Sequence, residues 1–137
     1  MYTKDEKTEI WLDSFRLEYA KKAQLYKLCS EPYALVKQFA KYRSQVGEIV
    51  GEESLAAMEK SLSSGEYMRS LLAKYTEKGI TCVTFSSELY PEDLRQIPDP
   101  PLVLYARGNL ELLRERKFAI VGSRRTPPAM MKQTERF

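Results

Sequence analysis

The chain has 137 residues, of which 43% are hydrophobic and 30% are charged, and its formal net charge is +3. This composition is typical of a globular protein with room for one ordinary domain or two small ones. The chain contains no histidine, which excludes imidazole-dependent catalysis and most zinc sites. We therefore expect no enzyme activity, no metal and no other cofactor.

The N-terminal residues MYTKDEKTEIW lack the basic and apolar regions of a signal peptide, and no apolar run approaches the length of a membrane helix. The two cysteines, Cys29 and Cys82, are isolated in the sequence and indicate free thiols in a reducing compartment. We expect a cytoplasmic protein with no membrane partner.

Hydrophobic residues recur at three- and four-residue steps through residues 5–78, with Lys and Glu between them, which predicts helices throughout this region. Pro32 suits the first turn of a helix over 32–41. Gly47 and Gly51 indicate a short connection. The pattern predicts four or five short helices in a small bundle, and no face of it is marked for binding.

The composition changes at Gly79. Short β-branched or apolar segments then predict three strands, at 80–85, 102–108 and 117–122. Between them we expect a short helix after Pro91 and a second at 109–116, capped by Asn109. The fold class is thus α+β to α/β, with a helical domain at 1–78 and a second domain at 79–137.

The third predicted strand contains FAIV, a continuous apolar run typical of a strand covered on both faces in a parallel sheet. It leads into Gly122, Ser123, Arg124 and Arg125, and Thr126 could cap a following helix. A strand, a glycine turn and a helix N-terminus in this order can bind a phosphate, with arginine forks as further donors. An ordinary turn with surface arginines would give the same spacing, so both interpretations stay open.

Charge is unevenly distributed along the chain. Residues 114–137 carry seven basic side chains against two acidic ones, whereas residues 1–78 are almost neutral with 13 basic and 12 acidic. This asymmetry favours an anionic partner near the 122–125 turn, although a solvated basic helix face would give the same count.

The stretch YPEDLRQIPDPPLVLYARGN (90–109), followed by FAIVGSR (118–124), resembles the DNA-processing protein A family, also called DprA or Smf. The helical 1–78 segment fits the small sterile-alpha-motif-like or helix-hairpin-helix-like domain of many members. The resemblance implies a Rossmann-like core, begun here as an incomplete parallel sheet, without catalytic chemistry. It places Gly122, Ser123 and Arg124 in a DNA-phosphate pocket, to which charge and position add Arg125.

The same resemblance implies a bacterial protein that binds single-stranded DNA during natural transformation, protects the incoming strand and helps load a RecA-type recombinase. It also implies a homodimer in the complete protein. The family's later glycine-rich motif is missing from this sequence, and the residues after Arg125 lack the Tyr and Gly of many members. We therefore expect an N-terminal fragment that binds DNA weakly or not at all.

Two other functions stay open. A Rossmann enzyme of the nucleoside-monophosphate hydrolase kind uses a similar glycine turn for a phosphate. Alternatively, the helical segment 1–78 is a protein-interaction module and the remainder is scaffold. The aromatic residues, most of which fall on helix faces beside leucines, are expected to pack in the core rather than to stack on bases.

Overall fold

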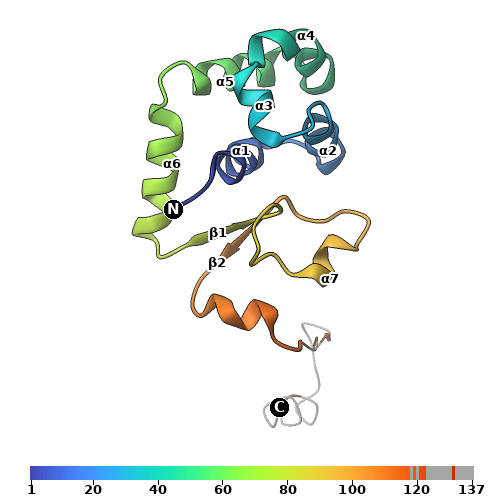
Figure 1. Cartoon of the computed structure of the whole chain (residues 1–137), viewed down its shortest axis with the longest axis vertical. Coiled ribbons are helices and arrows are strands. Elements are labelled where there is room, and N and C mark those ends of the chain that lie inside the picture. Colours follow the sequence, from blue (N-terminus) through green and yellow to red (C-terminus); the bar gives the residue numbers. More distant parts are fainter. Residues whose placement is uncertain (118, 120, 123–130, 132–137) are drawn as a thin grey trace.

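The computed structural model describes residues 1–117, 119, 121, 122 and 131. Within these residues it contains seven α-helices, one 3₁₀ helix and a two-stranded sheet, so the fold is mixed α+β. Figure 1 shows helices α2–α6 beside and above α1, with the sheet on the opposite side of α1 from α3, α4 and α5. The elements are α1 (Lys4–Asp13), α2 (Tyr19–Lys27), α3 (Pro32–Lys37), α4 (Phe39–Val50), α5 (Glu52–Leu62), α6 (Glu66–Glu77), β1 (Thr81–Thr84), α7 (Glu92–Arg95), β2 (Val103–Ala106) and the 3₁₀ helix η1 (Leu110–Arg114).

Helix α1 is the central element. It begins with a capping box, in which the Thr3 hydroxyl accepts from the Glu6 amide and the Glu6 carboxylate accepts from the Thr3 amide. Five consecutive residues, 8–12, are buried. Since successive residues point to different sides of a helix, α1 must be covered almost all round. Helix α3 contacts it from one side, and both strands contact it from the other.

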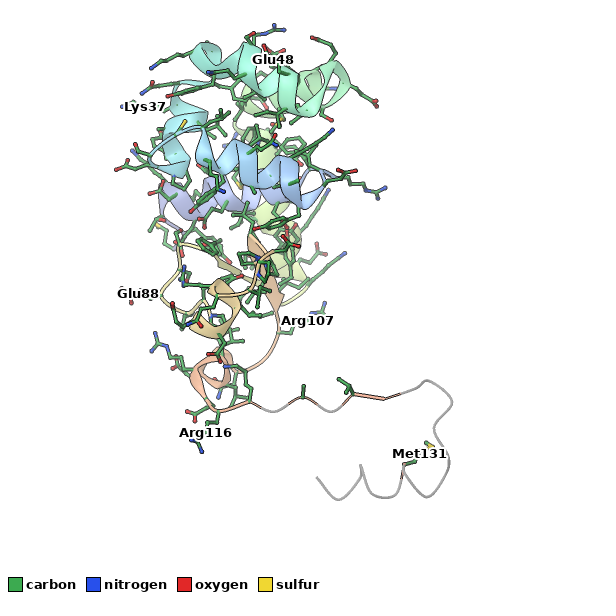
Figure 2. All side chains as sticks on the ribbon, turned by 90° about the vertical axis from the view of Figure 1, so that its right-hand side faces the viewer. Lys37, Glu48, Glu88, Arg107, Arg116 and Met131 are labelled. Atoms are coloured by element: carbon green, nitrogen blue, oxygen red, sulfur yellow. The ribbon has the colours of Figure 1, made fainter. Side chains whose placement is uncertain are left out.

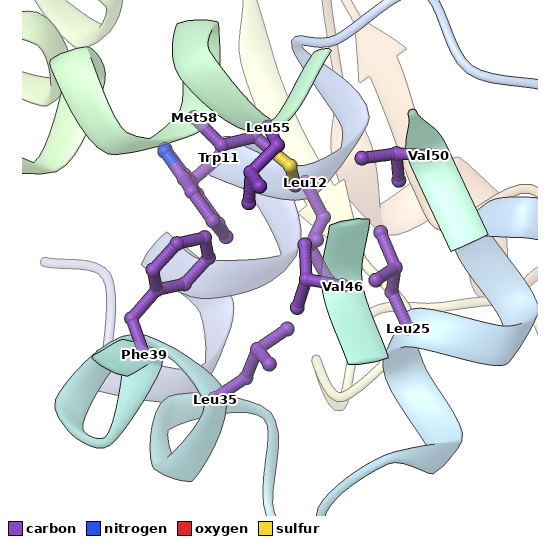
Figure 3. Packing of buried hydrophobic residues seen from close by; sticks show 9 residues of the cluster. All are labelled: Trp11, Leu12, Leu25, Leu35, Phe39, Val46, Val50, Leu55 and Met58. Carbon is purple, nitrogen blue, oxygen red and sulfur yellow. The ribbon is translucent and has the colours of Figure 1, made fainter. Parts of the chain in front are cut away.

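The larger hydrophobic core lies among the helices (Figure 3). Trp11 meets Phe15 and Phe39 edge to face, with ring centroids 5.3 and 6.0 Å apart. Its indole nitrogen donates to the Ser61 hydroxyl at 2.7 Å, which satisfies the one polar atom of the buried ring. These aromatic side chains pack in the core as predicted. The buried members of the cluster are Trp11, Leu12, Leu25, Leu35, Phe39, Val46, Val50, Leu55 and Met58.

A second, smaller cluster joins the helices to the sheet. Ile10 from α1 is fully buried against Cys82 of β1 and Val103 of β2. The Cys82 amide also donates to the Tyr2 hydroxyl at 2.9 Å. The part before residue 79 and the part after it therefore share buried contacts, while the predicted division into domains 1–78 and 79–137 stays a prediction.

The helical prediction for 5–78 is confirmed in outline, with six helices in place of four or five. The prediction for Gly47 is wrong, because this glycine lies inside α4 rather than in a connection. A Cβ at Gly47 would come within 3.1 Å of the Leu55 side chain, so the glycine allows α5 to approach α4 closely. Gly51 does end the helix, with φ at 86°, a left-handed conformation that glycine adopts without strain.

The first two predicted strands are confirmed, at 81–84 and 103–106, but they pair antiparallel with Thr81 opposite Ala106. The sequence predicted a parallel sheet, and this described pair does not have that arrangement. A parallel pair needs a crossover that returns the chain to the same end of the sheet. The connection over 85–102 instead folds back at the end of β1, so the chain re-enters the sheet in the opposite direction.

The third predicted strand, 117–122, differs from expectation. Lys117, Ala119, Val121 and Gly122 are not in a strand, and Val121 is 90% exposed. Phe118 and Ile120 lie outside the described residues. An apolar strand is buried only when neighbouring strands and a helical layer cover it, and no described element covers Ala119 or Val121.

Two local predictions after Gly79, the short helix after Pro91 and the Asn109 cap, are confirmed. A short helix, α7, follows Pro91, and the Asn109 side chain accepts from the Glu111 amide at 3.0 Å at the start of η1. Cys82 is buried, Cys29 is half-buried, and both are free thiols. Among the helices that the structure describes, none is long and apolar enough to cross a membrane.

Truncation of Ile10 should destabilise the whole molecule. We expect Ile10→Ala to lower the free energy of unfolding by about 2–5 kcal/mol, because it opens a cavity between α1 and both strands. Leu112→Ala is the matched control, since Leu112 is 60% exposed and its loss should stay within about 0.5 kcal/mol. Urea unfolding followed by Trp11 fluorescence measures both, and equal losses would contradict the packing described.

Candidate functional site

The phosphate turn predicted at 122–125 is described only at its first residue. Gly122 is exposed. Ser123, Arg124 and Arg125 lie outside the described residues, so their geometry stays a prediction. The segment that leads to the turn is described without a gap as far as Lys117, and its basic residues Arg116 and Lys117 are exposed. Figure 2 shows Arg116 far from Glu48, beyond the sheet.

Lys117 closes the end of η1. Its ammonium donates to the carbonyls of Leu113 and Glu115 at 2.7 and 3.1 Å. A cation at the C-terminal end of a helical turn satisfies carbonyls that have no partner within the helix. The Lys117 cation is therefore bound to backbone carbonyls of its own segment.

Arg95 organises the connection between the two strands. Its guanidinium donates to the carbonyl oxygen of Phe85 and, at 2.9 Å, to that of Ser87. It also lies over the rings of Phe85 and Tyr90, 4.9 and 5.0 Å from their centroids. Its Nε lies 3.3 Å from the Glu92 carboxylate. One side chain thus holds the end of β1 against α7.

Tyr90 makes a further contact within the same connection between the strands. Its ring is 4% exposed, and its hydroxyl donates to the Pro101 carbonyl at 2.6 Å. Burial raises the pKa of this phenol, although the nearby Arg95 cation opposes the shift. The hydroxyl therefore stays protonated as a donor and ties α7 to the residue just before β2.

Glu9 links the helices to the same connection. It is fully buried in α1, where its carboxylate accepts from the Tyr26 hydroxyl at 2.8 Å. Its other oxygen accepts from the Ser86 amide at 3.1 Å and the Ser86 hydroxyl at 2.8 Å. Burial and the nearby Glu9 charge raise the pKa of Tyr26, which keeps this donor protonated. A buried carboxylate is tolerated only when its oxygens are hydrogen-bonded in this way.

An open cleft of about 730 Å³ lies between the 88–95 segment and the 113–117 segment. Its charged lining is balanced, with four acidic side chains, Glu88, Glu92, Asp93 and Glu115, and four basic ones, Arg95, Arg114, Arg116 and Lys117. A polyanion gains little from a surface on which the two signs are equal. This cleft is therefore a weak candidate for a nucleic-acid site by itself.

The roles of Glu9 and Arg95 are not among those predicted from the sequence. Arg95 carried a usable signal, because it lies within the 90–109 stretch that carries the family resemblance. Glu9 carried none, since it stands in a run of charged residues that resembles an ordinary solvated helix face. Within the described ranges no group of three potential metal ligands occurs.

The second part of the chain resembles known proteins. Residues 81–137 match the sequence model of the family described as DNA recombination-mediator protein A. The DNA processing protein DprA of Bacillus subtilis is 48% identical over 64 residues, which make up 46% of this chain and 21% of that protein. The DNA processing protein DprA of Streptococcus pneumoniae is 51% identical over 37 residues, 27% of this chain and 13% of that protein.

The match is partial. The chain spans about a fifth of the length of the Bacillus relative, and no solved structure matches it. The resemblance predicted from residues 90–124 is confirmed over the matched segment. The described part of that segment contains both strands, the Arg95 contacts and the start of the basic stretch.

Loss of the Glu9 side chain should uncouple the helices from the 85–90 turn. We expect Glu9→Ala to lower the free energy of unfolding by about 2–4 kcal/mol, because three charge-assisted hydrogen bonds and packed volume are lost. Glu9→Gln should cost less, since its carbonyl can still accept from Ser86 and its amide can donate to Tyr26.

The control for both variants is Glu48→Ala on the exposed surface of α4, which should stay within about 0.5 kcal/mol of the parent. Thermal and urea unfolding measure the series. If Glu9→Ala is as stable as Glu48→Ala, the assigned role of Glu9 is wrong.

Replacement of Arg95 by lysine should also be costly, although the charge is kept. An ammonium has no planar face to lie over the Phe85 and Tyr90 rings while its protons reach both carbonyls, so we expect a loss of about 1–2 kcal/mol. Arg107→Lys, at an exposed arginine (Figure 2), should be neutral in the same unfolding assay. An Arg95→Lys protein with parental stability would show that the guanidinium geometry is unimportant.

Proposed function

We propose that the complete protein binds single-stranded DNA and acts as a recombination mediator in DNA uptake, because residues 81–137 match the sequence model of the family described as DNA recombination-mediator protein A. In this proposal it protects the incoming strand during natural transformation and helps to load a RecA-type recombinase. The observation that carries the proposal is the family match over residues 81–137, which includes the Gly-Ser-Arg turn.

The proposed DNA contact is the turn of Gly122, Ser123, Arg124 and Arg125. A glycine allows the backbone to approach a phosphate closely, and arginine offers a planar fork of donors that matches phosphate oxygens. The excess of basic residues over 114–137 supports an anionic partner at this end of the chain. Proteins that bind single strands without sequence preference need such a positive surface along the backbone of the strand.

The rest of the proposal follows from the family. We propose a cytoplasmic, non-enzymatic protein without a cofactor, with a Rossmann-like core and a sterile-alpha-motif-like helical domain over 1–78, that forms a homodimer when complete. The absence of histidine is consistent with a binding role. The aligned part of the 137-residue chain spans about a fifth of its Bacillus relative. We expect this chain by itself to bind DNA weakly or not at all.

The test is fluorescence anisotropy of a labelled deoxythymidine oligomer, measured over a range of salt concentrations. We expect the complete protein to bind more tightly than the 137-residue chain. In the complete protein, Arg124→Ala should weaken binding roughly tenfold and reduce the salt slope by about 0.7, the value for one lost phosphate contact.

Arg107→Ala is the control, because it removes the same charge from an exposed position outside the turn. Equal effects of the two substitutions would mean that charge alone matters and that the turn is not the contact. Failure of the complete protein to bind DNA would overturn the proposal. A preference for nucleoside monophosphates would then favour the hydrolase alternative.

A further inference from the structure

A groove between α2 and the 97–102 segment has no role in the function proposed above. Its volume is about 420 Å³, within the range of small-ligand sites. Helix α2 forms one wall with Tyr19, Lys22, Tyr26 and Lys27, and a proline-rich segment forms the other. The groove thus lies where the helical part of the chain meets the part that carries the family match.

The charge of the groove has one sign. Its lining contains three basic residues and no acidic one. Lys22 is paired with Asp13 at 2.8 Å, and Arg95 is held by backbone carbonyls, so these two are partly neutralised. Lys27 is exposed and has no ion pair within the described part of the chain. It is therefore the cation best placed to meet an anionic ligand.

The apolar surface of the groove is aromatic and accessible. Tyr19 is 38% exposed, unlike the aromatic residues of the core, and Ile97 opposite is 41% exposed. The deeper rings are held in place, because the Tyr26 hydroxyl donates to Glu9 and the Phe85 ring meets Tyr26 edge to face at 6.0 Å. A flat ring entering here would meet a fixed aromatic floor and little ordering would be needed.

We propose that this groove binds a base of single-stranded DNA against Tyr19, with Lys27 contacting an adjacent phosphate. Aromatic side chains beside a cation are the combination with which proteins bind single strands, since every base presents a face that can stack. Double-stranded DNA could not bind in this way, because its bases are stacked on each other and are not free to stack on Tyr19. The inference rests on the proposed function and adds a second contact, far in the sequence from the 122–125 turn.

The experiment uses the complete protein, with the 137-residue chain beside it, and a 12-residue deoxythymidine oligomer carrying 5-iododeoxyuridine. Ultraviolet crosslinking followed by mass spectrometry identifies the residues that touch the bases. We expect crosslinks at Tyr19 or Tyr26. Tyr19→Ala should reduce the yield about tenfold, whereas Tyr19→Phe should keep it, because phenylalanine can still stack.

A charge reversal tests the phosphate contact. Lys27→Glu should reduce crosslinking by at least about fivefold, since it replaces an attraction by a repulsion. Lys74→Glu is the matched control: Lys74 is exposed on α6, which Figure 1 shows on the other side of α1 from α2. Circular dichroism should show the helical content of all four variants to be unchanged.

The outcomes separate this proposal from the one before it. Crosslinks confined to residues 122–125, in the chain or in the complete protein, would overturn the groove and leave the proposed function standing. Failure of the complete protein to bind DNA would overturn both. If an acidic peptide protects Lys27 from acetylation and the oligomer does not, the groove is a protein-docking site and the proposal is wrong.

Discussion

The arrangement of this protein depends on one buried carboxylate. Glu9 is fully enclosed in α1 and accepts hydrogen bonds from Tyr26 of α2 and from both the amide and the hydroxyl of Ser86. A charge removed from water is costly, and its energy becomes acceptable only when hydrogen-bond donors surround it in a fixed geometry. Those donors come from segments 17 and 77 residues away in the chain. The requirement to satisfy Glu9 therefore brings the second helix and the turn after β1 to the same place.

Several features follow from this placement. Ser86 is held at α1, and the hydrogen bonds of Arg95 and Tyr90 hold together the folded connection between the two antiparallel strands. The prolines of that connection then lie across from α2, and the groove is the space between them. Ile10, the neighbour of Glu9, fills the gap beneath both strands. Beyond β2 the chain passes through η1 to the exposed basic residues that precede the proposed phosphate turn.

Local features of the fold could be read from the sequence, and features that depend on distant contacts could not. Pro32 at a helix start, Asn109 as a cap and the strands at 81–84 and 103–106 follow from short patterns. Gly47 predicts a break because a glycine usually interrupts a helix, whereas here the close approach of Leu55 accounts for a glycine inside α4. No periodicity of the sequence reveals the contacts of Arg95, which donates to two carbonyls in the connection between the antiparallel strands. The candidate site was predicted from family resemblance at 122–125, while the role of Glu9 needs the three-dimensional contacts.

The central claim is that α1 and the family-matched strands form one cooperative unit joined through Glu9 and Ile10. Native-state hydrogen exchange tests it directly, by comparing the Phe85 amide, which donates to the Leu102 carbonyl at 2.9 Å, with the Ser14 amide, which donates to Ile10 in α1. If the claim is correct, both amides exchange through the same opening, with equal free energies and equal dependence on denaturant. If Phe85 exchanges at a much lower free energy that denaturant does not change, the strands open independently and the claim is wrong.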